Sequence, residues 1–230
     1  MPELQIISAN VCPYAQRTRM ALRDKGLDFE LAEIDLKNKP DWFLDVSPYG
    51  KVPVLRHEGR TIYESAVINE YLDEAFADHP LMPTDPADRA LARIWIDYCN
   101  NQFCPLFYKL LLTQDAEGQQ ELAEKLKEVL LFMEHEGLEK LQGEGPYWMG
   151  AQPGLVDLTF YPFFERFCVL THYRGVELSA DCHRLKQWLA VMKEHPSAIV
   201  TANTDDFHIN NYKKYADGSA NGVTAKEMKK

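Results

Sequence analysis

The sequence predicts an α/β domain at the N-terminus followed by an all-helical domain. Over residues 1–77, short apolar runs of strand length alternate with helical patterns in the order βαβ, then α, then ββα. A stretch with little apolar periodicity follows and contains Pro80, Pro83 and Pro86. Beyond it the patterns are those of long helices only. We therefore expect an interdomain linker at 78–86 and a helical domain at 87–230.

In the first domain, Leu4-Gln5-Ile6-Ile7 is an apolar run typical of a short buried strand. A helix is expected from Pro13 to Lys25, because Pro suits the first helical position and Gly26 suits the position after the end. Alternation over 29–34 predicts a second strand. The remaining elements are a short helix or turn at 40–46, strands at 52–55 and 61–63 joined by a hairpin turn at 57–60, and a helix beginning at 64–65. The strand–helix–strand unit implies a parallel crossover, and the hairpin adds an antiparallel edge.

In the second domain, the patterns predict four helices. A helix over 87–112 should bend near Pro105, which cannot donate a backbone hydrogen bond. The segment 154–170 is strongly apolar and aromatic, so we expect a buried central helix there. An amphipathic helix at 119–141 and a helix at 184–194, ending before Pro196, complete the set. The polar tail 218–230 is expected to be frayed.

Composition narrows the classes of function. A net charge of −10 argues against a nucleic-acid partner, because such binding depends on Lys and Arg that neutralise phosphates. With no signal peptide or run long enough to cross a bilayer, we expect a cytoplasmic protein without a membrane partner. The odd number and wide spacing of the cysteines favour neither a disulfide framework nor a metal site: they are Cys12, Cys99, Cys104, Cys168 and Cys182. Cys99 and Cys104 lie in an apolar helical stretch, where core packing is expected.

Cys12 is the strongest candidate for chemistry. It follows a strand and precedes Pro13, so it should lie at a helix N-terminus. The unpaired N–H groups and the helix dipole there favour the thiolate, which is the nucleophilic form of cysteine. Ala15 stands where a Cys-x-x-Cys motif would have its second thiol, so this site has a single sulfur. A buried, inert cysteine is the alternative.

Two further segments of the first domain have the chemistry of a ligand site. Val52-Pro53 precedes a strand; trans is the default for such a bond, but a cis bond would turn the Val52 backbone outward to pair with an extended peptide. Glu64-Ser65 begins a helix, where Ser65 can cap or hold a carboxylate while Glu64 pairs with an ammonium. A ligand with both groups on one carbon is an α-amino acid, and the γ-glutamyl end of glutathione is one.

Residues 1 to about 200 resemble the cytosolic glutathione transferases, and among them the omega class. The resemblance rests on four segments: Cys12-Pro13-Tyr14-Ala15-Gln16-Arg17-Thr18-Arg19, Leu36-Lys37-Asn38-Lys39-Pro40-Asp41-Trp42-Phe43, Pro48-Tyr49-Gly50-Lys51-Val52-Pro53-Val54-Leu55 and Tyr63-Glu64-Ser65. Tyr71-Leu72-Asp73-Glu74-Ala75 continues it. The family joins a thioredoxin-like domain to a helical domain, so the same two-part fold is implied here.

The resemblance also implies roles. Cys12 would form a mixed disulfide with glutathione, beside Tyr14 where the class usually has Phe. The glycyl carboxylate would contact Lys39, the cysteinyl backbone would pair with Val52 before the cis-proline Pro53, and Glu64 and Ser65 would hold the γ-glutamyl group. Solvent-exposed charge is the alternative for Lys37 and Lys39. A homodimer is implied as well.

The second domain would supply the acceptor pocket. Its candidate lining residues are Phe103, Tyr108, Arg166 and Phe207, and core packing is an equal alternative for each aromatic ring. Arg166 lies in Phe163-Phe164-Glu165-Arg166, which resembles the omega segment facing that pocket. Gly154-Leu155-Val156-Asp157 resembles the family's capping box, with Gly154 where Ser or Thr is usual.

The implied activity is glutathione-dependent thiol transfer without a metal. The substrates expected by resemblance are glutathionylated thiols, dehydroascorbate and S-glutathionylated ketones, with reduction favoured over conjugation. Three alternatives stay open: reduction of glutathionyl-hydroquinones, whose enzymes have longer chains, reductive cleavage of aryl ethers or halides, and a non-catalytic ligand-binding or stress-associated role.

Overall fold

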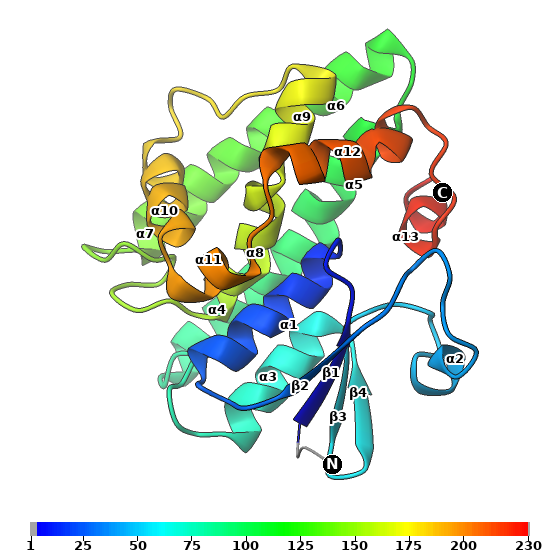
Figure 1. Ribbon diagram of the computed structural model, residues 1–230. Coiled ribbons are helices and arrows are strands. Elements are labelled where there is room, and N and C mark those ends of the chain that lie inside the picture. The colour runs from blue at the N-terminus through cyan, green and yellow to red at the C-terminus, as the bar shows by residue number, and fades with distance from the viewer. Residues whose placement is uncertain (1–3, 230) are drawn as a thin grey trace.

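A four-stranded mixed sheet organises the N-terminal half of the computed structural model, which describes residues 4–229 (Figure 1). The strand order is β2-β1-β3-β4. Their bounds are β1 Leu4–Ser8, β2 Glu30–Glu33, β3 Val54–His57 and β4 Arg60–Tyr63. The β1–β2 pair is parallel and places Ile6 opposite Leu31, whereas β1–β3 and β3–β4 are antiparallel. The parallel crossover and the antiparallel edge expected from the sequence are both present.

Alternate residues of the strands are buried on opposite faces of this sheet. Ile6 belongs to a core cluster with Leu22 of α1 (Pro13–Asp24) and Leu72 of α3 (Ser65–Ala75). Its neighbour Ile7 belongs to another cluster with Phe43 of α2 (Phe43–Val46). The β3–β4 hairpin turns at Glu58 and Gly59, with φ of 48° and 75°. Two consecutive positive φ angles match the tight turn that fits the strand twist.

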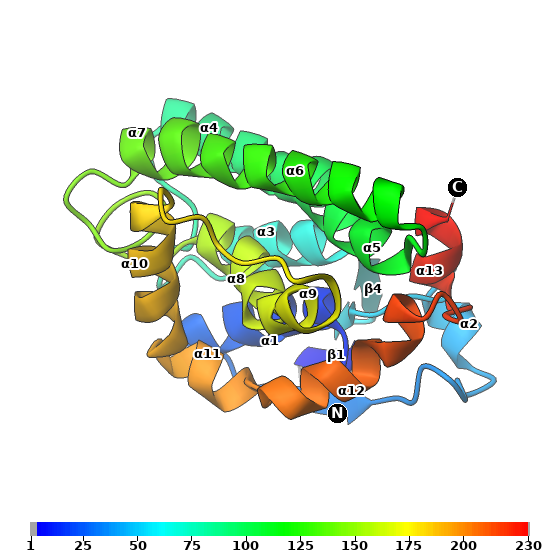
Figure 2. The ribbon, with the colours of Figure 1, turned by 90° about the horizontal axis from the view of Figure 1, so that it is seen from above.

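The C-terminal half is all-helical, which confirms the predicted fold class. Its helices are α4 Pro86–Tyr98, α5 Cys104–Leu112, α6 Ala116–Phe132, α7 Glu139–Leu141, α8 Leu155–Glu165, α9 Phe167–Arg174, α10 His183–Lys193, α11 Pro196–Thr201, α12 Asp205–Ala216 and α13 Val223–Met228. Figure 2 shows α8 inside this bundle, with α4 and α6 on one side and α10, α11 and α12 on the other. Over residues 4–229, no helix is long and apolar enough to cross a membrane.

Several helices differ from the sequence prediction. The expected helix 87–112 is interrupted by a π-helical turn, Cys99–Phe103, directly before Pro105, and a second π-helical turn, Met133–Leu138, lies in the expected helix 119–141. The expected helix 154–170 divides at Arg166, whose φ and ψ of −89° and 6° leave the helical region. The tail prediction is wrong for its middle part: α13 is helical, and its Ala225 is fully buried against α5.

Aromatic rings fill the core of the second domain around α8. Trp148 stacks on Phe160 with ring centres 4.4 Å apart, and Trp188 meets Trp148 edge-on at 5.7 Å. Asp157 lies beneath them and accepts hydrogen bonds from the Trp148 and Gly154 backbone N–H groups, both at 2.8 Å, and from Trp188 Nε1 at 2.7 Å. Gly154 has no side chain to offer, so Asp157 supplies the side-chain half of the predicted capping box.

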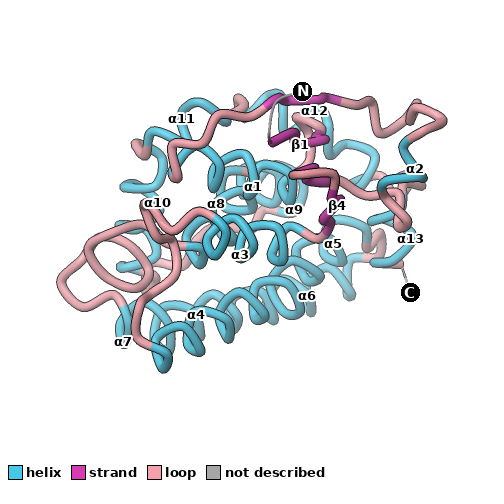
Figure 3. Tube along the Cα trace, turned by 90° about the horizontal axis from the view of Figure 1, so that it is seen from below, coloured by secondary structure: helices cyan, strands magenta, loops and turns pink. Residues whose placement is uncertain are grey.

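The two halves meet along α1, which packs against α3 on one side and α8 and α11 on the other (Figure 3). Arg17 Nε donates to the Thr159 carbonyl at 2.8 Å, and Gln16 Nε2 donates to Glu165 at 2.6 Å. Both side chains are buried. The helix that begins at Cys12 is therefore fixed by both domains.

Candidate active site

Cys12 lies where β1 leads into α1, half-buried and immediately before the first helical residue Pro13. Its backbone N–H donates to the Ala9 carbonyl at 2.9 Å, which fixes the turn. The thiol Sγ donates a hydrogen bond to the Val52 carbonyl, at 3.6 Å. The predicted position at a helix N-terminus is confirmed by this geometry.

The electrostatics of Cys12 differ from the expectation of a favoured thiolate. Burial raises the pKa of the Cys12 thiol, and this outweighs the backbone N–H groups of Ala15 and Tyr14 and the charges of Arg166 and Arg19, which lower the pKa. The helix terminus therefore acts in the predicted direction, but the net pKa lies above its ordinary value. The prediction of a favoured thiolate is wrong here, because it took no account of desolvation.

The Val52-Pro53 peptide bond is cis, the form that the resemblance implies and that the default expectation did not favour. Both residues are buried and directly precede β3. The Val52 carbonyl faces Cys12, so the loop and the thiol lie at one end of the sheet. This is the arrangement needed for a cysteinyl backbone to run beside Val52.

Glu64 and Ser65 lie where β4 leads into α3, and of the two alternatives for Ser65, the capping role is not observed. The N-cap position belongs to Glu64, which has a φ of 70° and makes no side-chain capping bond. Ser65 is the first helical residue and is buried, and its Oγ accepts a hydrogen bond from Arg17 Nη1 at 3.4 Å. The exposed Glu64 side chain and the N-terminus of α3 remain available to a ligand.

Lys39 lies in the loop between β2 and α2, where its Nζ donates to the Gly50 carbonyl at 2.7 Å. Its side chain is half-buried, whereas Lys37 is exposed. The alternative of a solvent-exposed charge therefore describes Lys37 better than Lys39. Gly50 lies two residues before Val52, so this hydrogen bond holds the Lys39 ammonium beside the loop that contains Val52.

Tyr14 lies between the domains rather than at the surface. Its ring meets Phe163 of α8 edge-on at 5.4 Å, and the Arg17 guanidinium carbon lies 4.8 Å from its ring centre. Burial raises the pKa of the Tyr14 hydroxyl well above its ordinary value, and nearby cysteines add to the rise. The hydroxyl therefore stays protonated and can donate.

Arg166 is fully buried at the break between α8 and α9. Its Nη1 donates to Gln16 Oε1 and to the Pro162 carbonyl, both at 2.6 Å. Within the described residues, its Nε and Nη2 have no hydrogen-bond partner. The positive charge of Arg166 lowers the pKa of Cys12. This guanidinium of the second domain therefore favours the thiolate form of Cys12.

The three aromatic candidates have different surroundings. Phe103 is fully buried and stacks on Phe164 with ring centres 5.1 Å apart, as in the core-packing alternative. Tyr108 is 3% exposed and shares a hydrogen bond with Tyr212 at 3.5 Å. Phe207 is half-buried at the start of α12, edge-on to His208. The structure thus brings Cys12, Tyr14, Val52 and Arg166 together and leaves Phe103 in the core.

Arg17 and Arg19 belong to the site, but the sequence did not indicate their roles. Both are buried on α1, and Arg19 Nη1 donates to Ser8 Oγ at 2.7 Å and to the Ala9 carbonyl at 3.3 Å, beneath the turn that carries Cys12. Their spacing of two places them on different sides of the helix. A signal was available for Arg17: the residues one helical turn away, at 13, 14, 20 and 21, are apolar or aromatic, and a charge among them needs a partner.

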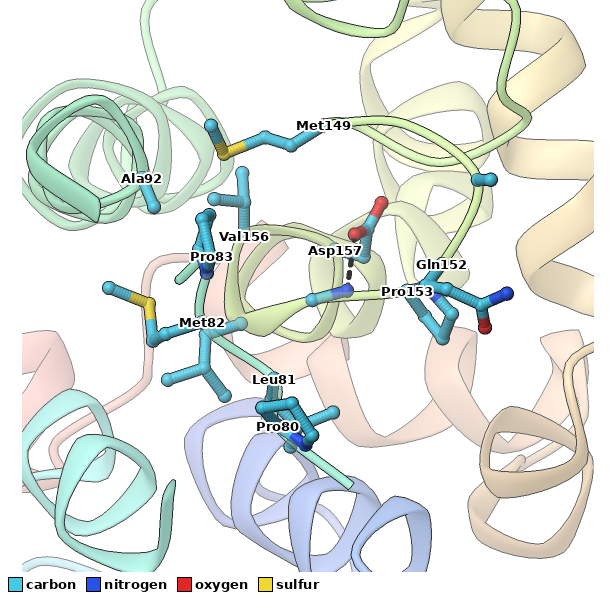
Figure 4. A pocket seen from close by; sticks show the side chains of 13 residues that line it. Pro80, Leu81, Met82, Pro83, Ala92, Met149, Gln152, Pro153, Val156 and Asp157 are labelled. Carbon is cyan, nitrogen blue, oxygen red and sulfur yellow. Dashed lines mark hydrogen bonds between the residues drawn. The ribbon is translucent and has the colours of Figure 1, made fainter. Parts of the chain in front are cut away.

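A pocket of about 290 Å³ lies elsewhere, between the linker and the start of α8 (Figure 4). Met82, Pro83 and Met149 give it apolar walls. Its one carboxylate, Asp157, is engaged by Gly154, Trp148 and Trp188, and Gln152 is the other polar side chain in its lining. Among residues 4–229, no three His, Cys, Asp or Glu side chains are grouped to hold a metal.

Two family models match the chain. Residues 11–75 match the N-terminal domain of glutathione S-transferases, and residues 116–191 match the C-terminal domain. The mouse protein glutathione S-transferase omega-1 is 34% identical over 197 residues, which cover 85% of this chain and 79% of that protein.

Solved structures agree with this assignment. Glutathione transferase Omega 3C from Trametes versicolor superposes with a TM-score of 0.84 at 30% identity, covering 94% of this chain and 91% of that one. Rice GST1, solved in complex with glutathione, gives a TM-score of 0.83 at 31% identity, covering 92% and 96%. With its thioredoxin-like and helical domains and its cysteine at the start of α1, the chain belongs to the glutathione S-transferase family and is an enzyme similar to the omega class.

Proposed function

We propose that this enzyme is a glutathione-dependent thiol transferase that works through a Cys12–glutathione mixed disulfide. The observation that carries the proposal is the position of the Cys12 thiol: it heads α1, faces the Val52 carbonyl and lies within reach of the Arg166 charge. A thiol at a helix N-terminus beside a cationic group is suited to nucleophilic attack on sulfur.

The proposed glutathione cradle uses only the first domain. The cysteinyl unit pairs with the backbone of Val52 before cis-Pro53, which brings its sulfur to Cys12. The γ-glutamyl ammonium pairs with Glu64 and its carboxylate with Ser65 at the N-terminus of α3, while the glycyl carboxylate meets Lys39. One relative is described as a complex with glutathione, which supports the same ligand here.

The proposed reaction is a pair of thiol–disulfide exchanges. The Cys12 thiolate attacks the glutathione sulfur of a mixed disulfide; a sulfur–sulfur bond forms at Cys12, and the acceptor leaves as a thiolate that takes up a proton. The thiolate of a second glutathione then attacks the Cys12 disulfide, releasing glutathione disulfide and restoring the Cys12 thiolate. Electrons pass only between sulfurs, so neither step needs a metal.

Because burial holds the pKa of Cys12 high, the thiolate needs local stabilisation during attack. Arg166 is suited to this role: its guanidinium is fixed by Gln16 and Pro162 and still has unpaired N–H groups. We assign the adjoining space to the acceptor, with Tyr108 and Phe207 as candidate walls. Phe103 supports these walls from the core, where it stacks on Phe164.

Intact-mass spectrometry after incubation with glutathione disulfide tests the proposal. The wild type should gain one glutathione, which reduced glutathione removes; Cys12→Ala should gain none, while the matched control Cys168→Ser should behave as the wild type. No adduct at Cys12 would overturn the proposal and favour a ligand-binding role. In Cys12→Ser, thiol transfer should be lost and conjugation should rise, and retained thiol transfer would contradict the mechanism.

We further propose a cytoplasmic homodimer. The exposed apolar side chains Val67 on α3 and Ile94 on α4, 56% and 60% exposed, flank the Arg93–Glu70 ion pair and suit an interface between copies. Light scattering of the wild type and of Val67→Asp/Ile94→Asp tests this: a wild-type mass of two chains that falls to one in the variant is expected. A monomeric wild type would contradict the dimer.

A further inference from the structure

A pair of sulfurs lies in the second domain, where the π-helical turn Cys99–Phe103 leads into α5 at Cys104. The two sulfur atoms of Cys99 and Cys104 are 3.6 Å apart, and both side chains are fully buried. The Cys104 backbone N–H donates to the Cys99 carbonyl, so the two residues lie one above the other across a five-residue turn. In an α-helix residues five apart point in different directions, and the wider π turn brings these thiols together.

A guanidinium faces both sulfurs. Arg17 Nη2 lies 3.3 Å from Cys99 Sγ and 3.4 Å from Cys104 Sγ. Burial raises the pKa of both thiols, and the Cys99 pKa stays well above its ordinary value. For Cys104, the hydrogen bond from Cys99 and the charge of Arg17 outweigh burial, so its pKa lies below the ordinary value. Of the two sulfurs, Cys104 therefore loses its proton more readily, and its neighbour Cys99 keeps its proton.

We propose that Cys99 and Cys104 form a redox-active dithiol, separate from Cys12, that a hydroperoxide oxidises to a disulfide within the helix. The Cys104 thiolate attacks one oxygen of hydrogen peroxide, and the O–O bond breaks. The products are a Cys104 sulfenic acid and a hydroxide ion, which leaves. The Cys99 sulfur then attacks the Cys104 sulfur; the S–S bond forms, and the hydroxyl leaves with the Cys99 proton as water. The dithiol loses two electrons, and the peroxide gains two.

The same arginine connects this pair to the glutathione cradle. Arg17 Nη2 faces the sulfurs, and its Nη1 donates to Ser65 Oγ at 3.4 Å and to Asn100 Oδ1 at 2.8 Å. In the disulfide, Cys104 can no longer form a thiolate that pairs with Arg17, so more of the Arg17 charge acts on the surroundings of Ser65. This second step rests on the proposed function: if Ser65 holds the γ-glutamyl carboxylate, oxidation should tighten the binding of a glutathione analogue roughly fivefold.

The dithiol can be tested on the wild-type protein, because trypsin releases residues 94–109 as one peptide that contains Cys99 and Cys104 and no other cysteine. The folded protein is treated with hydrogen peroxide, a small uncharged oxidant suited to a buried site, then denatured in acid with an alkylating reagent and digested. The expected peptide is lighter than the reduced peptide by two hydrogen atoms and takes up no reagent until it is reduced.

The proposal would be overturned if Cys99 and Cys104 both stay reduced, and are therefore both alkylated on this peptide, at a peroxide concentration that oxidises Cys12. A sulfinic acid on Cys104 without a disulfide, or a disulfide that forms only after unfolding in urea, would overturn it as well. Cys168→Ser should form the bond at the wild-type rate, whereas Cys99→Ser should give Cys104 sulfenic acid. If Cys99→Ser fails to fold, the wild-type peptide still decides the result.

The link to glutathione is measured separately, by calorimetry with S-methylglutathione in a Cys12→Ser background before and after oxidation. This analogue has no thiol, so it cannot reduce the disulfide. Tighter binding after oxidation supports the link, and equal binding in both forms overturns it. If neither form binds the analogue while the disulfide forms, the proposed cradle is wrong and the dithiol stands.

Discussion

The ammonium of Lys25, at the end of α1, lies 3.1 Å from a carboxylate oxygen of Asp73 on α3, with the two side chains 0% and 4% exposed. Lys25 Nζ also donates to the carbonyls of Asp78 and His79, and Asp73 accepts the backbone N–H of Leu81 at 2.6 Å. One buried ion pair therefore joins two helices of the first domain to the segment leading into the second.

Replacing Lys25 with Met should destabilise the protein by about 3 kcal/mol, because it leaves the Asp73 carboxylate buried with its main counter-charge removed. Urea denaturation measures the change. The matched control is Lys140→Met, which breaks the Lys140–Glu136 pair, whose side chains are 59% and 45% exposed, and should cost less than about 1 kcal/mol. Equal losses of unfolding free energy in the two variants would contradict the prediction that breaking the buried pair costs more than breaking an exposed one.

The reactivity of Cys12 should rise with pH, and this rise should occur at higher pH than for an ordinary cysteine thiol. Burial raises the pKa of Cys12, so the thiolate fraction and the rate of alkylation keep increasing in alkaline solution. The unfolded chain loses this proton at lower pH, so the same shift reduces folding stability as pH rises through the folded pKa. Alkylation by iodoacetamide, followed by mass spectrometry across pH, gives the profile.

Arg166→Met should move that profile upward by about one pH unit, since it removes a charge that lowers the Cys12 pKa. Arg60→Met, on the exposed side of β4, is the control and should leave the profile unchanged. A profile for Arg166→Met that coincides with the wild type, in a folded variant, would rule out an electrostatic role for Arg166 at the thiol.

Asp157→Asn should cost about 2–4 kcal/mol of folding free energy. The carboxylate is 1% exposed and accepts three N–H donors, and an amide group replaces one of its acceptor oxygens with a donor facing a donor. Denaturation followed by Trp fluorescence is suited to the test because Trp148 and Trp188 are two of those donors. The exposed Asp28→Asn control should change stability by less than about 0.5 kcal/mol.

Gly137→Ala should destabilise the second domain by about 1–3 kcal/mol through overpacking. An added Cβ would lie 2.9 Å from Trp148 Cζ2 and 3.1 Å from the ring of Trp95, and rigid indoles cannot move aside cheaply. Gly222→Ala meets no atom within 4 Å and serves as the control in a thermal melt. If both variants melt at the wild-type temperature, the core around Gly137 is looser than these distances imply.

Local chemistry made much of the first domain predictable. A short apolar run marked β1, alternation marked β2, and Gly26, which has a φ of 64°, ended α1 as expected. The small helices at the C-terminal end were not predicted, because α12 buries only His208, Tyr212 and Ala216 and so has a weak apolar pattern. The π-helical turn at Cys99 was also missed, since it arises from packing rather than from a sequence period.

The candidate site was predictable where it depends on the start of a helix, as at Cys12, whereas the cis form of the Val52-Pro53 bond followed only from the family resemblance. It was not predictable where charges are buried by the other domain. Arg17 and Arg166 are 1% and 0% exposed, and both face partners more than 80 residues away in the chain, such as Asn100 and Gln16. The net pKa of Cys12 depends on the burial of the thiol itself, which its position at a helix start does not reveal, so helix position alone gave the wrong direction.

The last helix has a consequence for handling the protein. Glu227 of α13 pairs with Lys51 at 2.8 Å, one residue before Val52, and both side chains are more than a third exposed. Such a contact is weakened by salt. Helix α13 therefore touches the loop that carries Val52, and the strength of that contact depends on salt. Kinetic measurements on variants are best compared at matched ionic strength.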